Sequence, residues 1–296
     1  MNYIFKDLSV TRGNKHNYLG MVFNIDNNKK SVEINMNSYI NEIVKYYEID
    51  GVAVTPVNKD LFVINADSKL LSSEEKKLFH SMLAKVMYLA KRVRPECLVA
   101  CSFLASRVNV VTEEDMSKLI RLLKYLNGTK DIGLRLMGDN YLTVIAFIDA
   151  SFGVHMDFKS HTGIAIVIGK GVIFAKSTKQ KLNSKSSTEA ELIAVSDGIG
   201  QVIWIRIFLI NQGYKINEVI IMQDNKSTIT MITNGTATSP RTRHVAVRFF
   251  FVKDRMDKKE IKLDYISTND MLADILTKPL QGSLFKRLRD QLLGAI

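Results

Sequence analysis

Residues 18–36 carry an alternation of apolar and polar positions that is typical of β-strands. Apolar side chains occupy every second position from residue 19 to residue 25, and again from residue 32 to residue 36. Successive residues of a strand point to opposite faces, so each run gives a strand with one apolar face. The polar residues 26–30 separate the two runs and form a turn. The pattern therefore predicts a β-hairpin.

Three stretches further along the chain repeat their apolar residues with helical spacing. They cover residues 39–47, 72–94 and 112–126. Ser72 precedes acidic residues in the first turn of the second stretch, which is typical of a helix start. Cys97 and Cys101 lie four apart in an apolar segment, which favours buried helix positions over a disulfide or zinc site. Residues 1–138 are therefore predicted to form a smaller, mostly helical α+β domain.

The pattern changes at residues 138–140, where a Gly-Asp-Asn segment marks the predicted domain boundary. The following domain, residues 139–296, alternates short apolar strands with helices. Its element order predicts an α/β fold with a mixed five-stranded sheet flanked by helices. The expected strands are 142–148, 163–168, 171–175, 219–222 and 261–266, and the expected helices are 186–212, 227–233 and 268–277.

The charge of the chain changes this picture by indicating a partner. Lys and Arg number 41 against 30 Asp and Glu, which gives a net charge of +11 over 296 residues. Clustered basic side chains release counterions from phosphate backbones, so a polyanion such as nucleic acid is expected. There is no charged-then-apolar leader and no apolar run of about 18 residues, so we expect an intracellular protein that is neither exported nor inserted in a membrane.

Two predicted strands each end in an aspartate, Asp149 and Asp224. If the strands are parallel and adjacent, both carboxylates emerge at the carboxyl edge of the sheet, where α/β folds place their sites. The helix from residue 186 offers Glu189 and Glu191. Glu189 fits a capping box with Ser186 as the N-cap, so we favour a structural role for Glu189 and a functional one for Glu191.

A fourth acid is expected from the segment 269–276. Asp270 lies in the first turn of a predicted helix, where a capping role is sufficient. Asp274 lies among apolar residues, where a carboxylate is costly unless it is paired or bound to a metal. Asp149, Glu191, Asp224 and Asp274 therefore form the candidate site. Four clustered carboxylates favour hard divalent ions, Mg²⁺ or Mn²⁺, and two such ions can activate water for an in-line displacement.

Basic residues flank the predicted acidic site on both sides in the sequence. Beside such a site a phosphate-binding role is favoured over a merely solvated surface. The candidate substrate-binding residues are Lys176, Lys179, Lys181, Lys185, Arg241 and Arg243. Trp204 and the run Phe249–Phe251 are expected in the core, and His244 is interpreted as a surface residue without a catalytic role.

The second domain contains a series of short strings around the candidate acids: Phe147-Ile148-Asp149-Ala150-Ser151, Lys159-Ser160-His161-Thr162-Gly163, Ser186-Ser187-Thr188-Glu189-Ala190-Glu191-Leu192, Asp224-Asn225, Arg241-Thr242-Arg243-His244 and Leu272-Ala273-Asp274-Ile275-Leu276-Thr277-Lys278-Pro279-Leu280. Taken together and in this order, they resemble the RNase H domain of copia-type (Ty1/copia) retrotransposon Pol polyproteins. The first half contains strings such as Tyr18-Leu19-Gly20-Met21 and Val93-Arg94-Pro95, which are similar to the segment that joins reverse transcriptase to RNase H in that family.

This resemblance implies an RNase H-like fold and a two-metal ribonuclease H that cuts the RNA strand of RNA–DNA hybrids. It places the catalytic acids on Asp149, Glu191, Asp224 and Asp274. It also implies that residues 1–138 are the end of the palm with thumb and connection elements of a reverse transcriptase.

The chain departs from this family in one respect, because no Asp-Asp pair occurs in it and the Tyr-x-Asp-Asp motif of the polymerase is missing. We therefore expect a fragment, either a processed piece or a truncated copy, without polymerase activity of its own. Two alternatives stay open. One is an inactive nucleic-acid-binding remnant, and the other is a module that supports a separate polymerase-bearing Pol chain.

Overall fold

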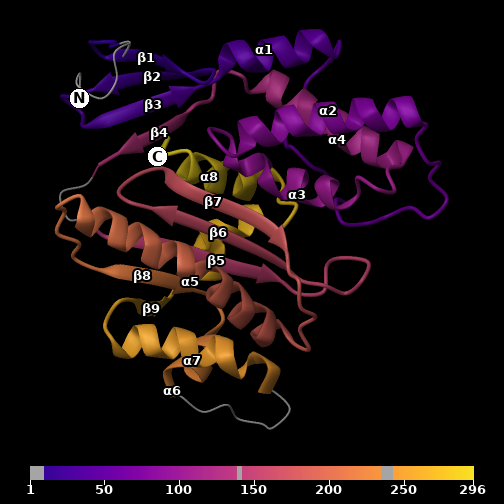
Figure 1. Cartoon of the computed structure of the whole chain (residues 1–296). Helices are drawn as coiled ribbons and strands as arrows, with labels where there is room; N and C mark the ends of the chain where they lie inside the picture. The colour runs from indigo at the N-terminus through magenta and orange to yellow at the C-terminus, as the bar shows by residue number, and fades with distance from the viewer. Residues whose placement is uncertain (1–9, 139–141, 235–242) are drawn as a thin grey trace, which may run out of the picture.

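The computed structural model describes residues 10–138, 142–234 and 243–296, without the side chains of residues 243–247. Figure 1 shows the arrangement of its elements. The strands are β1 (Lys15–Tyr18), β2 (Met21–Asp26), β3 (Ser31–Asn35), β4 (Leu134–Met137), β5 (Val144–Ser151), β6 (His161–Val167), β7 (Val172–Lys179), β8 (Val219–Gln223) and β9 (Lys262–Tyr265). The α-helices are α1 (Asn37–Tyr46), α2 (Ser73–Ala90), α3 (Leu98–Ser106), α4 (Glu113–Gly128), α5 (Ser187–Asn211), α6 (Lys226–Asn234), α7 (Arg243–Asp257) and α8 (Gly282–Leu292). Short 3-10 helices are η1 (Pro95–Cys97), η3 (Thr268–Asp270) and η4 (Leu272–Leu276).

The predicted hairpin near the start of the chain is confirmed as β2 and β3. Within the described residues it belongs to an antiparallel sheet of order β1-β2-β3-β4. Strand β4 was not expected from the sequence. It pairs with β3 from Ser31 opposite Met137 to Ile34 opposite Leu134, across more than 90 residues of intervening chain. Helices α2 and α4 begin as predicted, since Ser72 and Thr112 each close a capping box at their starts. Helix α1 begins after Met36, without a side-chain cap.

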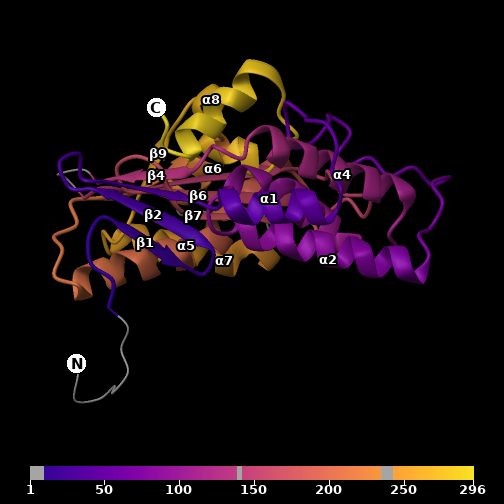
Figure 2. The same ribbon diagram turned by 90° about the horizontal axis from the view of Figure 1, so that it is seen from above.

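The second sheet has the order β7-β6-β5-β8-β9. Strands β5, β6 and β7 are antiparallel neighbours, whereas β8 pairs in parallel with both β5 and β9. The predicted mixed five-stranded sheet flanked by helices is therefore confirmed. Seen nearly edge-on, the sheet has α5 and α7 on one side and α8 on the other (Figure 2).

Two features of the second sheet and one of the segment that follows it correct the expectations from the sequence. Strand β5 runs on to Ser151, so Asp149 lies inside the strand rather than at its end. Strands β6 and β7 are longer than the apolar runs 163–168 and 171–175 indicate, because strand pairing continues over polar residues such as Thr162 and Thr178. The predicted helix 268–277 is not one α-helix, since η3 and η4 are separated by Met271, whose backbone is extended.

The long helix α5 crosses the second sheet and supplies much of its core. Its residues Ala190, Leu192, Val195, Ile199 and Val202 are buried in one cluster with the side chains of β5 and β8. By length and composition α5 is apolar enough to cross a membrane, a test that core helices also pass. Its buried face against the sheet makes α5 a core helix.

A second buried cluster joins residues on both sides of position 138. It includes Phe79 and Leu123 from the first half together with Leu276, Phe285 and Leu288 from the C-terminal segment. Helix α8 therefore packs on the helices of the first half, although it comes after the second sheet in the chain. The division into 1–138 and 139–296 stays a prediction. Cys97 and Cys101 are free and buried in this cluster, as expected.

Candidate active site

The central acids of the site come from two adjacent parallel strands. Strand β5 pairs with β8 up to Phe147 opposite Met222. Two residues further along, Asp149 on β5 and Asp224 just after β8 point the same way, because side chains alternate along a strand. The parallel pairing that the sequence left conditional is therefore present, and it brings the two carboxylates to one region of the sheet.

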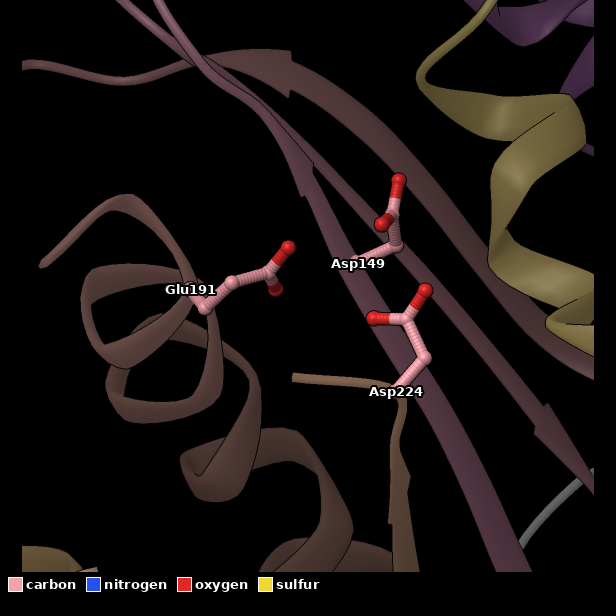
Figure 3. A group of neighbouring side chains, drawn as sticks. All are labelled: Asp149, Glu191 and Asp224. Carbon is pink, nitrogen blue, oxygen red and sulfur yellow. The ribbon is translucent and has the colours of Figure 1, made fainter. Parts of the chain in front are cut away.

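Helix α5 brings Glu191 to the same place. One carboxylate oxygen from each of Asp149, Glu191 and Asp224 can be chosen so that all three lie within 4.8 Å of one another. The three side chains point toward a common space between α5 and the ends of the strands (Figure 3). Asp149 and Glu191 are 2% and 5% exposed, whereas Asp224 is half-buried.

Asp274 joins this group from η4 through a lysine. The Nζ atom of Lys278 donates to Oδ1 of Asp274 at 2.7 Å and lies 3.6 Å from Oδ1 of Asp149. Asp274 is 4% exposed, so its carboxylate is held inside the protein. All four acids predicted from the sequence therefore lie in one neighbourhood. Three share a common space, and the fourth contacts Asp149 through Lys278.

Neighbouring polar side chains fix the orientation of each acid. Gln223 Nε2 donates to Glu191 at 3.2 Å, and Thr268 Oγ1 donates to Asp224 at 2.7 Å. Thr277, which is fully buried, donates its hydroxyl to Asp149. These contacts hold the carboxylates in place by hydrogen bonds while leaving other oxygen lone pairs available.

Burial is the main cause of the altered pKa values in the site. It raises the pKa of Glu191 well above its usual range, and the charges of Asp149 and Asp224 add to this effect. Burial likewise raises the pKa of Asp149, against the charge of Lys278. The pKa of Asp274 rises to about 7 through burial and the charge of Asp149. The charges of Asp149 and Asp274 raise the pKa of Lys278 despite its burial.

The donor set of the site fits a divalent metal ion. Crowded carboxylates repel one another, and the elevated pKa values record the free energy needed to ionise them together. A divalent ion relieves that repulsion, and hard oxygen donors suit Mg²⁺ or Mn²⁺. Asp149, Glu191 and Asp224 are the residues that could hold such an ion.

The two glutamates of α5 have the different roles that the sequence indicated, with one change. Ser186 is the N-cap, and its hydroxyl accepts from the backbone N–H of Glu189 at 3.2 Å. The Glu189 carboxylate, however, accepts from the backbone N–H of Lys185 at 2.8 Å, one residue before the N-cap. The expected contact to Ser186 is therefore replaced by one to Lys185, and Glu189 still closes the start of the helix.

The predicted substrate-binding lysines lie around the far edge of the sheet. Lys176 and Lys179 are on β7, which is separated from β5 by β6, and Lys181 lies in the loop beyond them. All three line a cavity of about 280 Å³ together with Arg248. Lys179 is paired with Asp157 at 2.8 Å. These basic residues therefore line a cavity at the β7 edge of the sheet, and none of the four acids lines that cavity.

The remaining basic candidates are less defined. Lys185 lies one residue before the N-cap of α5, and its backbone N–H donates to the carboxylate of Glu189. Arg241 lies outside the described residues, and Arg243 begins α7 without a described side chain. A substrate-binding role for the six basic residues stays a prediction.

Two expectations about aromatic residues are wrong. Trp204 is 58% exposed on α5 and stacks on Phe208, at 5.4 Å between ring centroids. Phe249 is buried as expected, but Phe250 and Phe251 are exposed. Helix α5 is apolar nearly all round, so sequence spacing does not reveal which side of it meets the sheet.

Sequence reasoning missed the residues that support the acids. In the sequence, Thr277 and Lys278 belong only to a string that resembles the family, and Gln223 only to the predicted strand before Asp224. The hydrogen bonds of Thr277 to Asp149 and of Gln223 to Glu191 join residues that are 128 and 32 positions apart. The only available signal was that a threonine and a glutamine each adjoin a predicted acid-bearing segment.

No family model matches the chain. A curated relative, the retrovirus-related Pol polyprotein from transposon RE1 of Arabidopsis thaliana, is 31% identical over 216 residues, which are 72% of this chain and 15% of the relative. The corresponding polyprotein from transposon RE2 of the same plant is 30% identical over 237 residues, 79% of this chain and 16% of the relative. The Ty1-JR2 Gag-Pol polyprotein of Saccharomyces cerevisiae is 26% identical over 252 residues, 80% of this chain and 14% of the relative.

Solved structures that match part of the chain include two RNase H proteins. An N-terminal RNase H domain from Mycobacterium tuberculosis has a TM-score of 0.34 and 12% identity, and the match covers 46% of this chain and 91% of that chain. LC11-RNase H1, solved in complex with an RNA/DNA hybrid, has a TM-score of 0.34 and 14% identity, with 45% and 92% covered.

The family resemblance found in the sequence is confirmed by the curated relatives, although the chain spans only about 15% of the length of the first of them. This chain therefore belongs with the retrovirus-related Pol polyproteins of copia-type and Ty1 transposons, to one segment of which it is homologous.

Proposed function

We propose that the chain is a metal-dependent ribonuclease H that cleaves the RNA strand of RNA–DNA hybrids with two divalent ions, Mg²⁺ or Mn²⁺. The observation that carries the proposal is the meeting of Asp149, Glu191 and Asp224 within 4.8 Å. Two of these carboxylates are buried, where ionised acids are costly unless a cation balances them. The homology to Pol polyproteins supports the same activity.

The acids of the chain have distinct roles in this proposal. Asp149, Glu191, Asp224 and Asp274 bind the ions. Gln223, Thr268 and Thr277 hold the carboxylates of Glu191, Asp224 and Asp149 in place through their hydrogen bonds. Divalent ions bound at such a site supply Lewis-acid activation of water and of the leaving oxygen. Asp224 is half-buried, so it is the most accessible acid of the trio.

The basic surface supports a nucleic-acid substrate. The net charge is +11, and Lys176, Lys179, Lys181 and Arg248 gather along one cavity. We propose that these side chains contact the phosphate backbone of the hybrid, which attracts them regardless of sequence. Selection of RNA over DNA at the cut strand would rest on contacts to its 2′-hydroxyls.

The test is cleavage of a hybrid with a labelled RNA strand, in Mg²⁺ and in Mn²⁺. Wild-type protein should cut the RNA and leave the DNA intact. Asp149→Asn and Asp224→Asn should abolish cleavage while preserving hybrid binding. Asp264→Asn is the matched control, because Asp264 lies on β9 of the same sheet but pairs with Lys262 at the surface. Its cleavage rate should equal that of wild type.

The same experiment separates the alternative function. Binding of the hybrid that weakens steeply with salt, without any cleavage by the wild type in either metal, would identify an inactive nucleic-acid-binding remnant instead. A polymerase-bearing Pol chain is the proposed protein partner, because the relatives are far longer than this chain. Co-purification of the two chains would test that partnership.

A further inference from the structure

The Lys278 ammonium lies between two buried carboxylates of the acidic site. Its distances to the carboxylate oxygens are 2.7 Å for Asp274 and 3.6 Å for Asp149. The side chains of these two acids are 6% and 2% exposed, whereas that of Lys278 is 34% exposed. The lysine therefore reaches inward from a half-buried position, and it contacts acids that are almost fully buried.

Asp149 is shared between two groups in the site. On one side it belongs to the trio with Glu191 and Asp224, and on the other it faces Lys278 and Asp274. The hydroxyl of Thr277, the residue before Lys278, also donates to Asp149. The backbone N–H of Lys278 donates to the carbonyl of Asp274 at 2.8 Å, so the peptide that carries the lysine is fixed next to both acids.

We propose that Lys278 is a built-in cation that balances Asp149 and Asp274 and competes with a second divalent ion for them. The trio Asp149, Glu191 and Asp224 has no lysine or arginine within ion-pair distance apart from this one, among the ion pairs of the described residues. The first ion, held by all three carboxylates, therefore meets the ammonium only beside Asp149, whose Oδ1 lies 3.6 Å from it. A second ion at the Asp149–Asp274 side has to displace the ammonium from both carboxylates.

This inference rests on the proposed function, since it assumes that the trio binds a divalent ion. It also explains how Asp149, Glu191 and Asp274 can be buried close to one another. One fixed positive charge, held at hydrogen-bond distance, offsets part of their repulsion. The consequence is two unequal metal sites on one set of carboxylates.

The test is titration of the full chain with Mn²⁺, in which bound ions are counted by calorimetry and by the electron paramagnetic resonance signal of free Mn²⁺. Wild type should bind one ion tightly and a second at least about tenfold more weakly, because a unit charge a few ångströms away opposes the second ion. Lys278→Met should tighten the second ion by at least about tenfold and leave the first nearly unchanged. Equal binding curves for Lys278→Met and wild type would overturn the inference.

Two further variants keep the result interpretable. Lys278→Arg retains the charge, so its second ion should stay as weak as in wild type. If the Arg variant instead bound the second ion as tightly as the Met variant, charge would not be the cause and the inference would fail. Lys262→Met removes an exposed lysine paired with Asp264 and should change neither ion.

Thermal unfolding gives an independent readout. In EDTA, Lys278→Met should unfold at a lower temperature than wild type, and saturating Mn²⁺ should reduce this difference. A variant that folds only with Mn²⁺ supports the inference in the same way. If wild type itself bound no divalent ion, the proposed function would fail at the metal site, whereas normal wild-type binding with an unchanged Lys278→Met curve would remove this inference alone.

Discussion

Asp149 on β5 lies directly opposite Gly163 on β6 in the antiparallel ladder. A Cβ atom on Gly163 would lie 2.7 Å from Cγ2 of Thr277 and 2.8 Å from the carbonyl oxygen of Ala273. The bare backbone of this glycine is therefore what allows η4 to pack against β6, beside Asp149. This close packing lets Thr277 donate a hydrogen bond to Asp149 and brings Asp274 to the other side of Lys278 from Asp149.

Replacing this glycine tests whether the close packing of η4 matters for the site. Gly163→Ala should push η4 away, because a backbone oxygen and a buried threonine oppose the new methyl group. We expect a loss of about 1–3 kcal/mol in the free energy of unfolding, as in other overpacked cores, together with weaker Mn²⁺ binding. Urea unfolding and Mn²⁺ titration measure the two effects.

The matched control is Gly200→Ala on α5, where an added Cβ meets nothing within 4 Å. That change should be neutral or slightly stabilising, because alanine favours a helix more than glycine does. Equal stability of the Gly163→Ala variant and wild type would contradict the assigned role of Gly163.

The pKa of Glu191 predicts how the metal-free protein responds to pH. Its folded pKa is raised by burial, so the folded state holds a proton that the unfolded state releases above its ordinary pKa of about 4.3. The contribution of Glu191 to stability is therefore largest at low pH and falls as pH rises through the folded pKa. Glu191→Gln should raise the thermal unfolding temperature in EDTA at pH 8 and leave it nearly unchanged at pH 4.

The same variant should lose the metal response. Gln cannot balance a divalent charge, so saturating Mn²⁺ should stabilise Glu191→Gln far less than wild type. A Glu189→Gln variant, two residues away on the same helix, should keep the response of wild type. If Mn²⁺ stabilised the Glu191 and Glu189 variants equally, Glu191 would not be a metal ligand.

A buried pair of histidines predicts a second pH dependence, of opposite sign. His155 Nε2 lies 3.0 Å from His161 Nδ1, and His161 Nε2 lies 2.7 Å from Ser177 Oγ, whose hydroxyl donates to the carbonyl of Leu276 in η4. Because the Ser177 hydroxyl donates to Leu276, Nε2 of a neutral His161 donates to Ser177. The Nδ1 atom of His161 then carries no proton and accepts from Nε2 of His155. Burial, the main cause, lowers the pKa of His155 to about 4 and that of His161 to about 3.

Both histidines are therefore neutral in the folded state, whereas they take up protons in the unfolded state below a pKa of about 6.5. Their contribution to stability is present above that pH and is lost as the pH falls toward 4. His161→Gln should flatten this part of the curve of unfolding free energy against pH, relative to wild type. His80→Gln, at an exposed position on α2, should leave the slope between pH 6.5 and 4 unchanged. A slope in the His161 variant identical to that of wild type would refute the prediction.

The ion pair of Arg94 and Glu96 predicts a large effect on stability far from the acids. Both side chains are 0% exposed, at 2.7 Å, and Arg94 also donates to the carbonyl and the hydroxyl of Thr129. Arg94→Met leaves a buried carboxylate without its cation, which should cost about 3–5 kcal/mol in urea unfolding. Lys69→Met, which breaks an exposed pair with Glu113, should cost less than about 1 kcal/mol.

The sequence by itself determined the local elements and the identity of the acids. Apolar spacing predicted the hairpin, the helices and the succession of strands and helices after residue 138, because strand and helix periods are properties of neighbouring residues. It also separated Glu191 from Glu189, since a capping role is decided within four residues of chain. Asp149 and Asp224 were recognisable because polar acids follow apolar runs.

The tertiary structure alone decided which distant groups meet. Strand β5 pairs with β8, which lies about 70 residues later in the chain. The hydrogen bond from Thr277 to Asp149 and the contact of Lys278 with Asp149 join segments that are still further apart. The same holds for β4, which pairs with β3, and for the exposed side of α5 that carries Trp204. Local pattern fixes what a segment can form, whereas the choice among possible partners is made by burial and hydrogen bonding across the whole fold.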